Sequence, residues 1–246
     1  MALVLATAAA SIPGAAAGRG IALSASPLRL RLEGASRSTV VVRNPGRRAL
    51  LVKVTRAGFA RSPRGAPRVR PARRAAGWLH LSPRRFRIAP GGTRTLHVVA
   101  APPRRAAPGD HPALVLLTTR PLGVRRVRVR LRVGVVVDLR VRGRIVRRLE
   151  PQALTVRRRG AQRILELRLV NRGNVTERLD NRVRLVLRSH GRAVARLRPR
   201  RRGELLPHSA GIVTFVYAGP VRGRVRAQVE LRRAGRRHLH AFWIRL

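Results

Sequence analysis

Cysteine is absent from the chain. Its absence excludes disulfide bonds, thiolate nucleophiles, C-x-x-C redox chemistry and cysteine-ligated zinc. With 246 residues, the chain is long enough to be held together by burial of apolar side chains alone. The missing cysteines therefore limit the chemistry of the protein without placing it in a reducing compartment.

Acidic side chains are also scarce, at nine against 56 lysines and arginines. No two of them are spaced as a general acid and base would be, and the chain carries no G-x-S-x-G, phosphate-binding loop or G-x-G-x-x-G motif. His238 and His240 share one face of a predicted strand, but no third metal ligand accompanies them. We therefore predict a protein that is not an enzyme and that uses no cofactor and no metal.

Aromatic residues make up 3% of the sequence. Stacking of bases or sugars needs exposed rings, whereas most of these rings occur in alternating apolar segments typical of a core. Trp78 differs because it borders an arginine-rich segment, and we keep it as a candidate partner-binding residue. The aromatic residues are Phe59, Phe86, Phe215, Phe242, Tyr217, Trp78 and Trp243.

The formal net charge is +47, and Lys53 is the only lysine. Arginines occur along nearly every predicted strand and loop instead of in one cluster, which favours a general bias toward arginine at exposed positions. Such a charge nevertheless attracts anions and makes folding sensitive to salt. An anionic partner is therefore a second explanation, either an envelope polymer or nucleic acid bound nonspecifically through its phosphates.

Residues 2–17, ALVLATAAASIPGAAA, have the apolar centre and the A-x-A ending of a secretory signal peptide, although no charged residue precedes them. We therefore predict a signal peptide over residues 1–18. No other segment has the roughly eighteen apolar residues that a membrane span requires. The protein is predicted to be exported, to the periplasm or envelope, the cell surface or the extracellular medium.

The segment Val127–Val141 alternates strictly, with an apolar residue at every odd position. A period of two places the apolar side chains on one face of a strand and the arginines on the other. We predict one long strand here, bent at Gly134, with one face on a core and the other in solvent. The arginines of the solvent face are Arg128, Arg130, Arg132 and Arg140.

Period-two segments separated by Gly, Pro, Asn and Asp run through most of the chain, which is typical of an all-β protein. Ala60–Gly77 has no such period and is rich in Arg, Pro and Ala, so we predict a long, mobile, basic loop there. The other predicted strands of the first half are Ile21–Leu32, Ser38–Arg43, Leu50–Thr55, Thr93–Ala100 and Ala113–Thr119.

Two pairs of segments recur in the same order. STVVVRNPG at Ser38–Gly46 is echoed by LELRLVNRG at Leu165–Gly173, and each ends in Asn, one residue and Gly. APGGTRTLHVV at Ala89–Val99 is echoed by LPHSAGIVTFV at Leu206–Val216. We therefore predict two tandem immunoglobulin-like β-sandwich domains, over residues 19–148 and 149–246. A single large barrel is the alternative.

The first predicted domain also carries a series of short motifs in a definite order. They are SPLRL at Ser26–Leu30, VRNPG at Val42–Gly46, WL at Trp78–Leu79, LSP at Leu81–Pro83, IAPGGT at Ile88–Thr93 and GDH at Gly109–His111. Over residues 21–142 this order resembles the PapD-like immunoglobulin-fold proteins. These include the periplasmic pilus chaperones and, more similar still, the WxL-interacting N-terminal domains of Gram-positive cell-surface proteins.

The resemblance implies a protein partner. Pilus chaperones anchor the terminal carboxylate of a subunit with an arginine on the first strand and a lysine on the last. Arg29 falls at the first of these places, whereas the second falls near Gly134, with Arg132 beside it and no lysine. Half of this clamp is missing, but a partner strand can still pair with the edge of the long strand. The candidate partner-binding residues are Arg29, Arg128, Arg130, Arg132 and Trp78.

Taken together, the sequence predicts an exported binding protein of the cell envelope. It would be a surface scaffold or a chaperone-like module that recognises another surface protein or an anionic wall polymer. The alternative is a basic β-protein associated with nucleic acid through the phosphate backbone.

Overall fold

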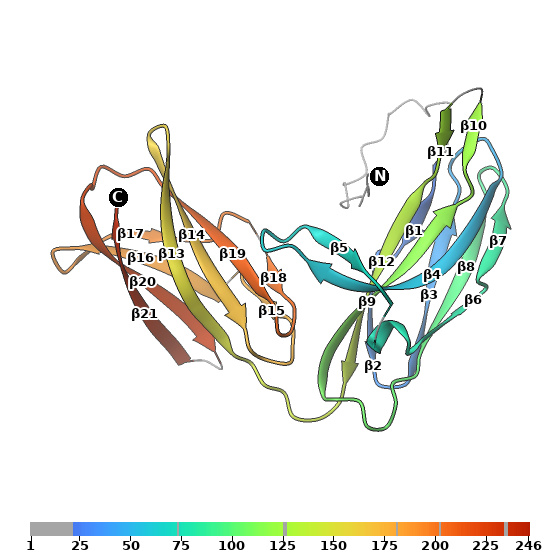
Figure 1. Ribbon diagram of the computed structural model, residues 1–246, viewed down its shortest axis with the longest axis horizontal. Coiled ribbons are helices and arrows are strands. Elements are labelled where there is room, and N and C mark those ends of the chain that lie inside the picture. Colours follow the sequence, from blue (N-terminus) through green and yellow to red (C-terminus); the bar gives the residue numbers. More distant parts are fainter. Residues whose placement is uncertain (1–21, 73, 125–126, 181, 202, 234–235) are drawn as a thin grey trace. The chain divides into compact units, whose positions relative to one another are not determined.

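The structure, a computed structural model, describes residues 22–246 except residues 73, 125–126, 181, 202 and 234–235 (Figure 1). The described chain divides into two compact units. The first comprises the residues up to Phe59 together with 69–107 and 111–142, and the second comprises 60–68, 108–110 and 143–246. The predicted signal peptide, residues 1–18, lies outside the described residues, and the predicted boundary between residues 148 and 149 remains a prediction.

Two sheets enclose the core of the first unit (Figure 1). One has the strand order β1-β3-β8-β6. The other has the order β2-β12-β9-β4-β5, with β7 also paired to β4, and β10 and β11 form a separate hairpin. The strands are β1 (Ser24–Ser26), β2 (Arg29–Glu33), β3 (Ser36–Arg43), β4 (Leu50–Arg61), β5 (Pro67–Arg70), β6 (Leu79–Ser82), β7 (Arg85–Ile88), β8 (Thr93–Ala100), β9 (Gly109–Thr119), β10 (Leu122–Val124), β11 (Val127–Val129) and β12 (Arg132–Val141).

The predicted first strand, Ile21–Leu32, is divided between the two sheets, so its prediction as one element is wrong. β1 pairs antiparallel with β3, whereas β2 pairs parallel with β12. The chain changes sheet between Ser26 and Arg29, at Pro27, which has no N–H to continue a ladder. Pairing with partners far along the chain therefore decides the division, and a local period of two does not carry that information.

The alternating pattern does predict which side chains form the core. On β12, Val135, Val137 and Leu139 are fully buried, and on β3 Val40 and Val42 are also fully buried. Residues between them on the same strands are exposed or half-buried. The period of two is therefore genuine, and the outward positions carry the arginines.

The long strand predicted over Val127–Val141 is interrupted, so its predicted length is wrong. β11 ends at Val129 and β12 begins at Arg132. Between them, the Leu131 N–H donates to Thr119 Oγ1 (3.0 Å), and the Leu131 carbonyl accepts the Thr119 N–H (3.0 Å). β11 turns back to pair with β10, and Val129 is 40% exposed.

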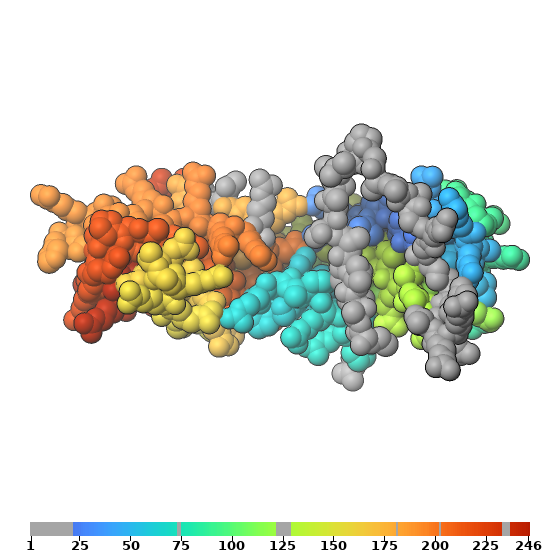
Figure 2. All heavy atoms as spheres, turned by 90° about the horizontal axis from the view of Figure 1, so that it is seen from above, coloured from blue at the N-terminus to red at the C-terminus, as the bar shows by residue number. Residues whose placement is uncertain are grey.

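The segment Ala60–Gly77 is structured, so its prediction as a long basic loop is wrong. β4 continues to Arg61, β5 returns beside it, and the 3-10 helix η1 (Arg74–Ala76) follows. Most of β5 is exposed, and Figure 2 shows this part of the chain in cyan at the molecular surface. Its arginines and prolines conceal the strand, because neither residue type favours a sheet.

The second unit is likewise built of sheets around one core (Figure 1). Its sheets have the orders β13-β14-β19, β15-β18 and β17-β16-β20-β21. The strands are β13 (Leu149–Arg159), β14 (Gln162–Asn171), β15 (Glu177–Arg178), β16 (Val183–Ser189), β17 (Arg192–Leu197), β18 (Glu204–Leu205), β19 (Ala210–Tyr217), β20 (Arg224–Arg233) and β21 (Arg236–Arg245). Both units are immunoglobulin-like β-sandwiches, which confirms the predicted fold class.

Asn44 follows the last residue of β3 in the first unit and is fully buried. Its Nδ2 donates to the carbonyls of Arg48 (2.7 Å), Ala89 (3.1 Å) and Ile88 (3.3 Å). Its Oδ1 accepts the Gly46 N–H (3.1 Å). One side chain therefore joins the turn that follows β3 to the turn that precedes β8.

Asn171 does the same at the end of β14 in the second unit, and it too is fully buried. Its Nδ2 donates to the carbonyls of Val175 (2.7 Å), Leu205 (3.1 Å) and Leu206 (3.1 Å), and its Oδ1 accepts the Gly173 N–H (2.9 Å). The predicted repeat is thus a repeat of structure, and its asparagines hold equivalent pairs of turns in the two units.

Not all aromatic residues are core residues as predicted. Phe215 and Tyr217 are buried on β19, but Trp243 on β21 is 64% exposed. The guanidinium carbon of Arg224 lies 4.8 Å from the centre of the Trp243 ring, on the adjacent strand. Phe242 and Ile244 of the same strand do face the core, so of these two neighbouring rings the prediction is wrong for Trp243 alone.

Arg163 is an inward-facing cation at the end of the second core. It is 9% exposed, and its Nη1 has no hydrogen-bond partner. Burial, and then repulsion from Arg222 and Arg158, lower the pKa of its guanidinium. We expect Arg163→Met to raise the free energy of unfolding, because an incompletely paired buried cation is replaced by an apolar chain. Urea denaturation measures this, and a loss of stability would contradict the interpretation.

Candidate functional site

The edge of β12 is the feature of the first unit that best suits binding. β2 pairs with β12 only from Val136 to Arg140. The first four residues of β12, Arg132–Val135, lie ahead of the start of β2, because the two strands are parallel and Arg29 is opposite Val136. In the described part of the chain, therefore, no strand covers this side of β12 ahead of Val136.

The direction of the backbone groups at this edge follows from two hydrogen bonds. The Leu131 backbone faces β9, because it pairs with Thr119, and the Val136 N–H faces the other way, because it donates to the Leu28 carbonyl (2.9 Å). Successive residues of a strand point to alternate sides. The N–H and C=O groups of Arg132 and Gly134 therefore point away from β9, toward the side on which a further strand can pair with them. Arg132 is half-buried there and Gly134 is buried.

Beside this edge, the apolar side chains face the core and the arginines do not. Val133 packs against the core, Val135 is fully buried, and Arg132 lies on the other face and is half-buried. Arg130 is exposed just ahead of the strand. The structure thus brings Arg130 and Arg132 together at the uncovered edge.

Arg29 lies on β2, and its Nε donates to Oδ2 of Asp138 on the neighbouring strand β12. Arg29 is thus paired within the protein, to a carboxylate of the adjacent strand. Gly134 supplies no charge, and a Cβ there would lie 3.3 Å from Leu114, so the position is also tight. At the two positions where the resemblance implies cations that bind a subunit's terminal carboxylate, the structure therefore has an arginine paired within the protein and a glycine.

The remaining candidate residues are placed elsewhere. Trp78 is half-buried against the core of the first unit and meets His111 edge-on, with ring centres 4.9 Å apart. His111 is near the start of β9, whereas Leu131, just ahead of the uncovered edge, pairs with Thr119 at the end of β9. Arg128 is on β11, and its side chain lies outside what the structure describes.

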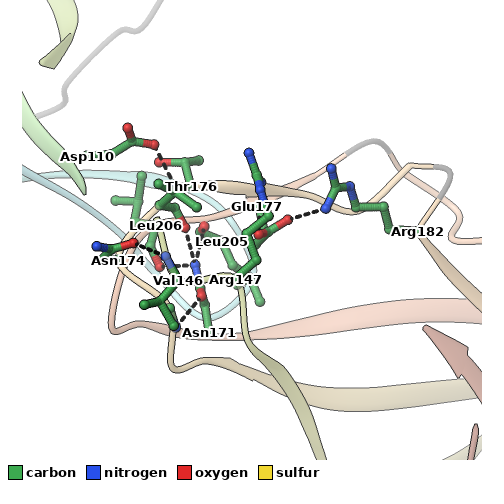
Figure 3. Close-up of polar contacts among 12 residues, drawn as sticks. Asp110, Val146, Arg147, Asn171, Asn174, Thr176, Glu177, Arg182, Leu205 and Leu206 are labelled. Carbon is green, nitrogen blue, oxygen red and sulfur yellow. Dashed lines mark hydrogen bonds and ion pairs between the residues drawn. The ribbon is translucent and has the colours of Figure 1, made fainter. Parts of the chain in front are cut away.

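The second unit holds a polar network in the loop between β14 and β15 (Figure 3). The Asp110 carboxylate accepts the Thr176 N–H (2.8 Å), and the Asn174 carbonyl accepts the Asp110 N–H (2.7 Å). Gly109 has a φ of +123°, and a Cβ there would lie 2.2 Å from the Asn174 carbonyl oxygen, so only glycine fits. Asp110 therefore fixes a loop.

Glu177 is the buried charge of this network, at 1% exposure. Its Oε1 accepts Nη1 of Arg147 (3.0 Å), and its Oε2 accepts Nη1 of Arg182 (2.8 Å), as Figure 3 shows. With both oxygens paired, the carboxylate is suited to holding the loop together and not to acid–base chemistry.

A small pocket of about 150 Å³ adjoins Glu177 and is also lined by His238, His240 and Glu150. In the described residues, no group of three His, Asp or Glu side chains is placed to hold a metal ion. Hydrogen bonds from Arg172 and Arg148 lower the pKa of the Glu150 carboxyl, against a smaller opposing effect of burial.

The lowered pKa of Glu150 has a consequence for acid stability. The stabilisation that the ionised Glu150 carboxyl gives to the folded protein is complete at a pH above the pKa of this group in the unfolded chain. It is lost as the pH falls through the lower pKa of the same group in the folded protein. We expect Glu150→Gln to flatten the pH dependence of the midpoint of urea unfolding in this acidic range. An unchanged slope would contradict the pairing with Arg172 and Arg148.

Solved structures supply the comparison. A chain of a chaperone–tip adhesin complex of CFA/I fimbriae matches with a TM-score of 0.53 and 9% identity, over 91% of this chain and 98% of that one. The class 5 fimbrial chaperone CfaA matches with a TM-score of 0.51 and 10% identity, again over 91% and 98%. The fold is that of the fimbrial chaperones. No family model and no curated protein matches the sequence.

The fimbrial-chaperone fold confirms the fold that the predicted resemblance implied. At these identities the similarity extends to the fold and no further. The described part of the chain offers no helix with the length and hydropathy needed to cross a bilayer.

Proposed function

We propose that the protein is an exported, non-enzymatic binding protein of the cell envelope, chaperone-like or a scaffold, which holds a protein partner by strand addition. The partner strand pairs with the outward backbone groups of Arg132 and Gly134 on β12. The observation that carries this proposal is the register of β2, which begins opposite Val136 and leaves the first part of β12 uncovered by the described strands. Main-chain pairing at such an edge gives affinity, and alternate side chains give specificity.

Two further observations support this proposal. The solved structures that share the fold are fimbrial chaperones, one of them in complex with a tip adhesin. The candidate residues Arg130 and Arg132 stand beside the edge, whereas Arg29 contributes by fixing β2 through Asp138. These comparisons give no support to the alternative of a nucleic-acid-associated protein. The anionic wall polymer likewise has no observation in its favour beyond the net charge.

The edge can be tested with a matched pair of variants. Arg132→Pro removes the N–H that a partner strand would use, whereas Arg132→Ala removes the same charge and keeps the N–H. The probe is a short synthetic peptide of alternating valine and threonine. We expect Arg132→Pro to abolish its binding and Arg132→Ala to weaken it only slightly, measured by calorimetry. Equal binding by the two variants would contradict strand addition.

A further inference from the structure

Two adjoining hollows lie on the first unit, along β4 and the segment that leads into β7. One has a volume of about 430 Å³ and the other about 280 Å³, and Lys53 and Arg85 line both. Among the described residues, no carboxylate lines either hollow. The basic trough is defined by its cations, which are Lys53, Arg56, Arg84, Arg85, Arg120 and Arg130.

The carboxylates of the first unit are committed elsewhere. Among its described residues the acidic side chains are Glu33 and Asp138. Glu33 accepts Nε of Arg142 (2.9 Å), and Asp138 accepts Nε of Arg29. The positive charge of the basic trough therefore has no counter-charge among the residues that line it.

Lys53 and Arg85 also stand directly opposite each other on β4 and β7. Like charges at directly opposed positions of two strands destabilise the pairing. An anion bound between them would remove this repulsion, so the trough gains from an acidic occupant. Both side chains are exposed and accessible to one.

The lining residues indicate the chemical class of that occupant. No aromatic ring lines either hollow, so the base stacking that single-stranded nucleic acid uses is missing. Thr55 and Thr118 add hydroxyl groups that can donate to carboxylates. Two hollows joined through shared residues suit an extended chain of carboxylates better than one compact anion.

One residue of the basic trough lies close in sequence to the uncovered edge. Arg130 lines one of the two hollows and is two residues ahead of the start of β12. The distance from an added strand at this edge to β4, across β12 and β9, is three strand spacings, or about 14 Å. Four or five extended residues cover that distance, at about 3.3 Å each.

We propose that the partner strand held at the β12 edge is flanked by a short acidic segment, which lies in the basic trough against Lys53 and Arg85. This inference rests on the proposed function and adds the chemistry of the partner to it. The attraction between the acidic segment and the cations of the basic trough determines which end of the partner strand lies at the trough. It therefore also sets the register of the partner strand on β12.

Lys53 permits a direct test because it is the only lysine in the chain. Reductive methylation with ¹³C-formaldehyde labels its amine and keeps its charge, and the α-amine serves as a separate reference signal. The probes are the alternating valine–threonine peptide with about five glutamates at either end, and the same peptides with glutamines, since five extended residues span the trough. Amide exchange at Arg132 and Gly134 reports strand addition in the same samples.

We expect a glutamate-tailed peptide to shift the Lys53 signal until the shift saturates. The peptide concentration at half of this shift should equal the concentration at which the amides of Arg132 and Gly134 are half protected. The glutamine-tailed peptide should protect the amides and leave the Lys53 signal in place. Protected amides with an unmoved Lys53 signal for every glutamate peptide would overturn this inference alone. Unprotected amides with all peptides would overturn the proposed function.

A net charge of +47 binds anions nonspecifically, so a variant with matched charge is needed. Arg85→Glu/Arg120→Glu should weaken the glutamate-tailed peptide by roughly tenfold, whereas Arg196→Glu/Arg198→Glu, on and just after β17, should change it less than about twofold. Equal losses would contradict a defined site. An oligothymidylate or polyphosphate that saturates the Lys53 shift at lower concentration than the peptide would overturn the assignment to a protein segment.

Discussion

Replacing Asn44 by alanine should lower the free energy of unfolding of the first unit by about 3 kcal/mol. The amide donates to three carbonyls in a fully buried site, and alanine leaves all three carbonyls and the Gly46 N–H without this partner. A buried polar group that loses its partner destabilises the folded state by more than the loss of the same hydrogen bond at an exposed site, because water can replace the partner only at the exposed site. Chemical denaturation followed by Trp78 fluorescence measures the loss in this unit.

The matched control for this variant is Arg47→Ala, in the same turn but exposed, which should change stability by less than about 0.5 kcal/mol. Because Asn171 makes the equivalent contacts in the second unit, Asn171→Ala should cause a similar loss there. A loss below about 1 kcal/mol for both asparagines would contradict the view that they hold their turns together.

The second large effect concerns Glu177. Removing both of its partners in Arg147→Ala/Arg182→Ala leaves a carboxylate at 1% exposure without a cation, and we expect a loss of about 3 kcal/mol. Adding Glu177→Gln to the double variant removes the stranded charge and should recover most of the loss. Urea unfolding monitored by circular dichroism measures all three proteins.

Glu150 provides the control for Glu177, because it is also held by two arginines, Arg148 and Arg172, but its side chain is 30% exposed. The variant Arg148→Ala/Arg172→Ala should lose less than about 1 kcal/mol, as water replaces the partners. Equal losses at the two glutamates, or a triple variant that is no more stable than the double variant, would show that burial of Glu177 is not the cause.

Much of the fold could be predicted from local pattern. An apolar side chain at every second position requires one buried face, and Val135, Val137 and Leu139 are fully buried as that argument demands. The recurrence of Asn, one residue and Gly after an alternating strand identified the repeat. In each unit that asparagine bonds to carbonyls some 35 to 45 residues away, which the short motif alone does not reveal.

The errors arose where distant partners override the local pattern. The interruption at Leu131 depends on Thr119, the division of the first strand depends on β3 and β12, and β5 depends on β4. A period of two indicates that a strand exists, but it does not determine which strand lies beside it or where pairing stops.

The candidate site could be predicted only in part for the same reason. Arg130 and Arg132 were identified because they alternate with valines, but the uncovered edge beside them exists only through the register of β2. Lys53 and Arg85 are thirty-two residues apart and became neighbours through the pairing of β4 with β7. No sequence motif marks either one.

Amide hydrogen exchange at Arg132 and Gly134 tests the central proposal most directly. If this edge of β12 accepts a partner strand, both amides should exchange rapidly in the free protein, and the alternating peptide should slow them while Val133 and Val135 stay protected throughout. Slow exchange in the free protein, or exchange that a saturating peptide leaves unchanged, would contradict strand addition at this edge.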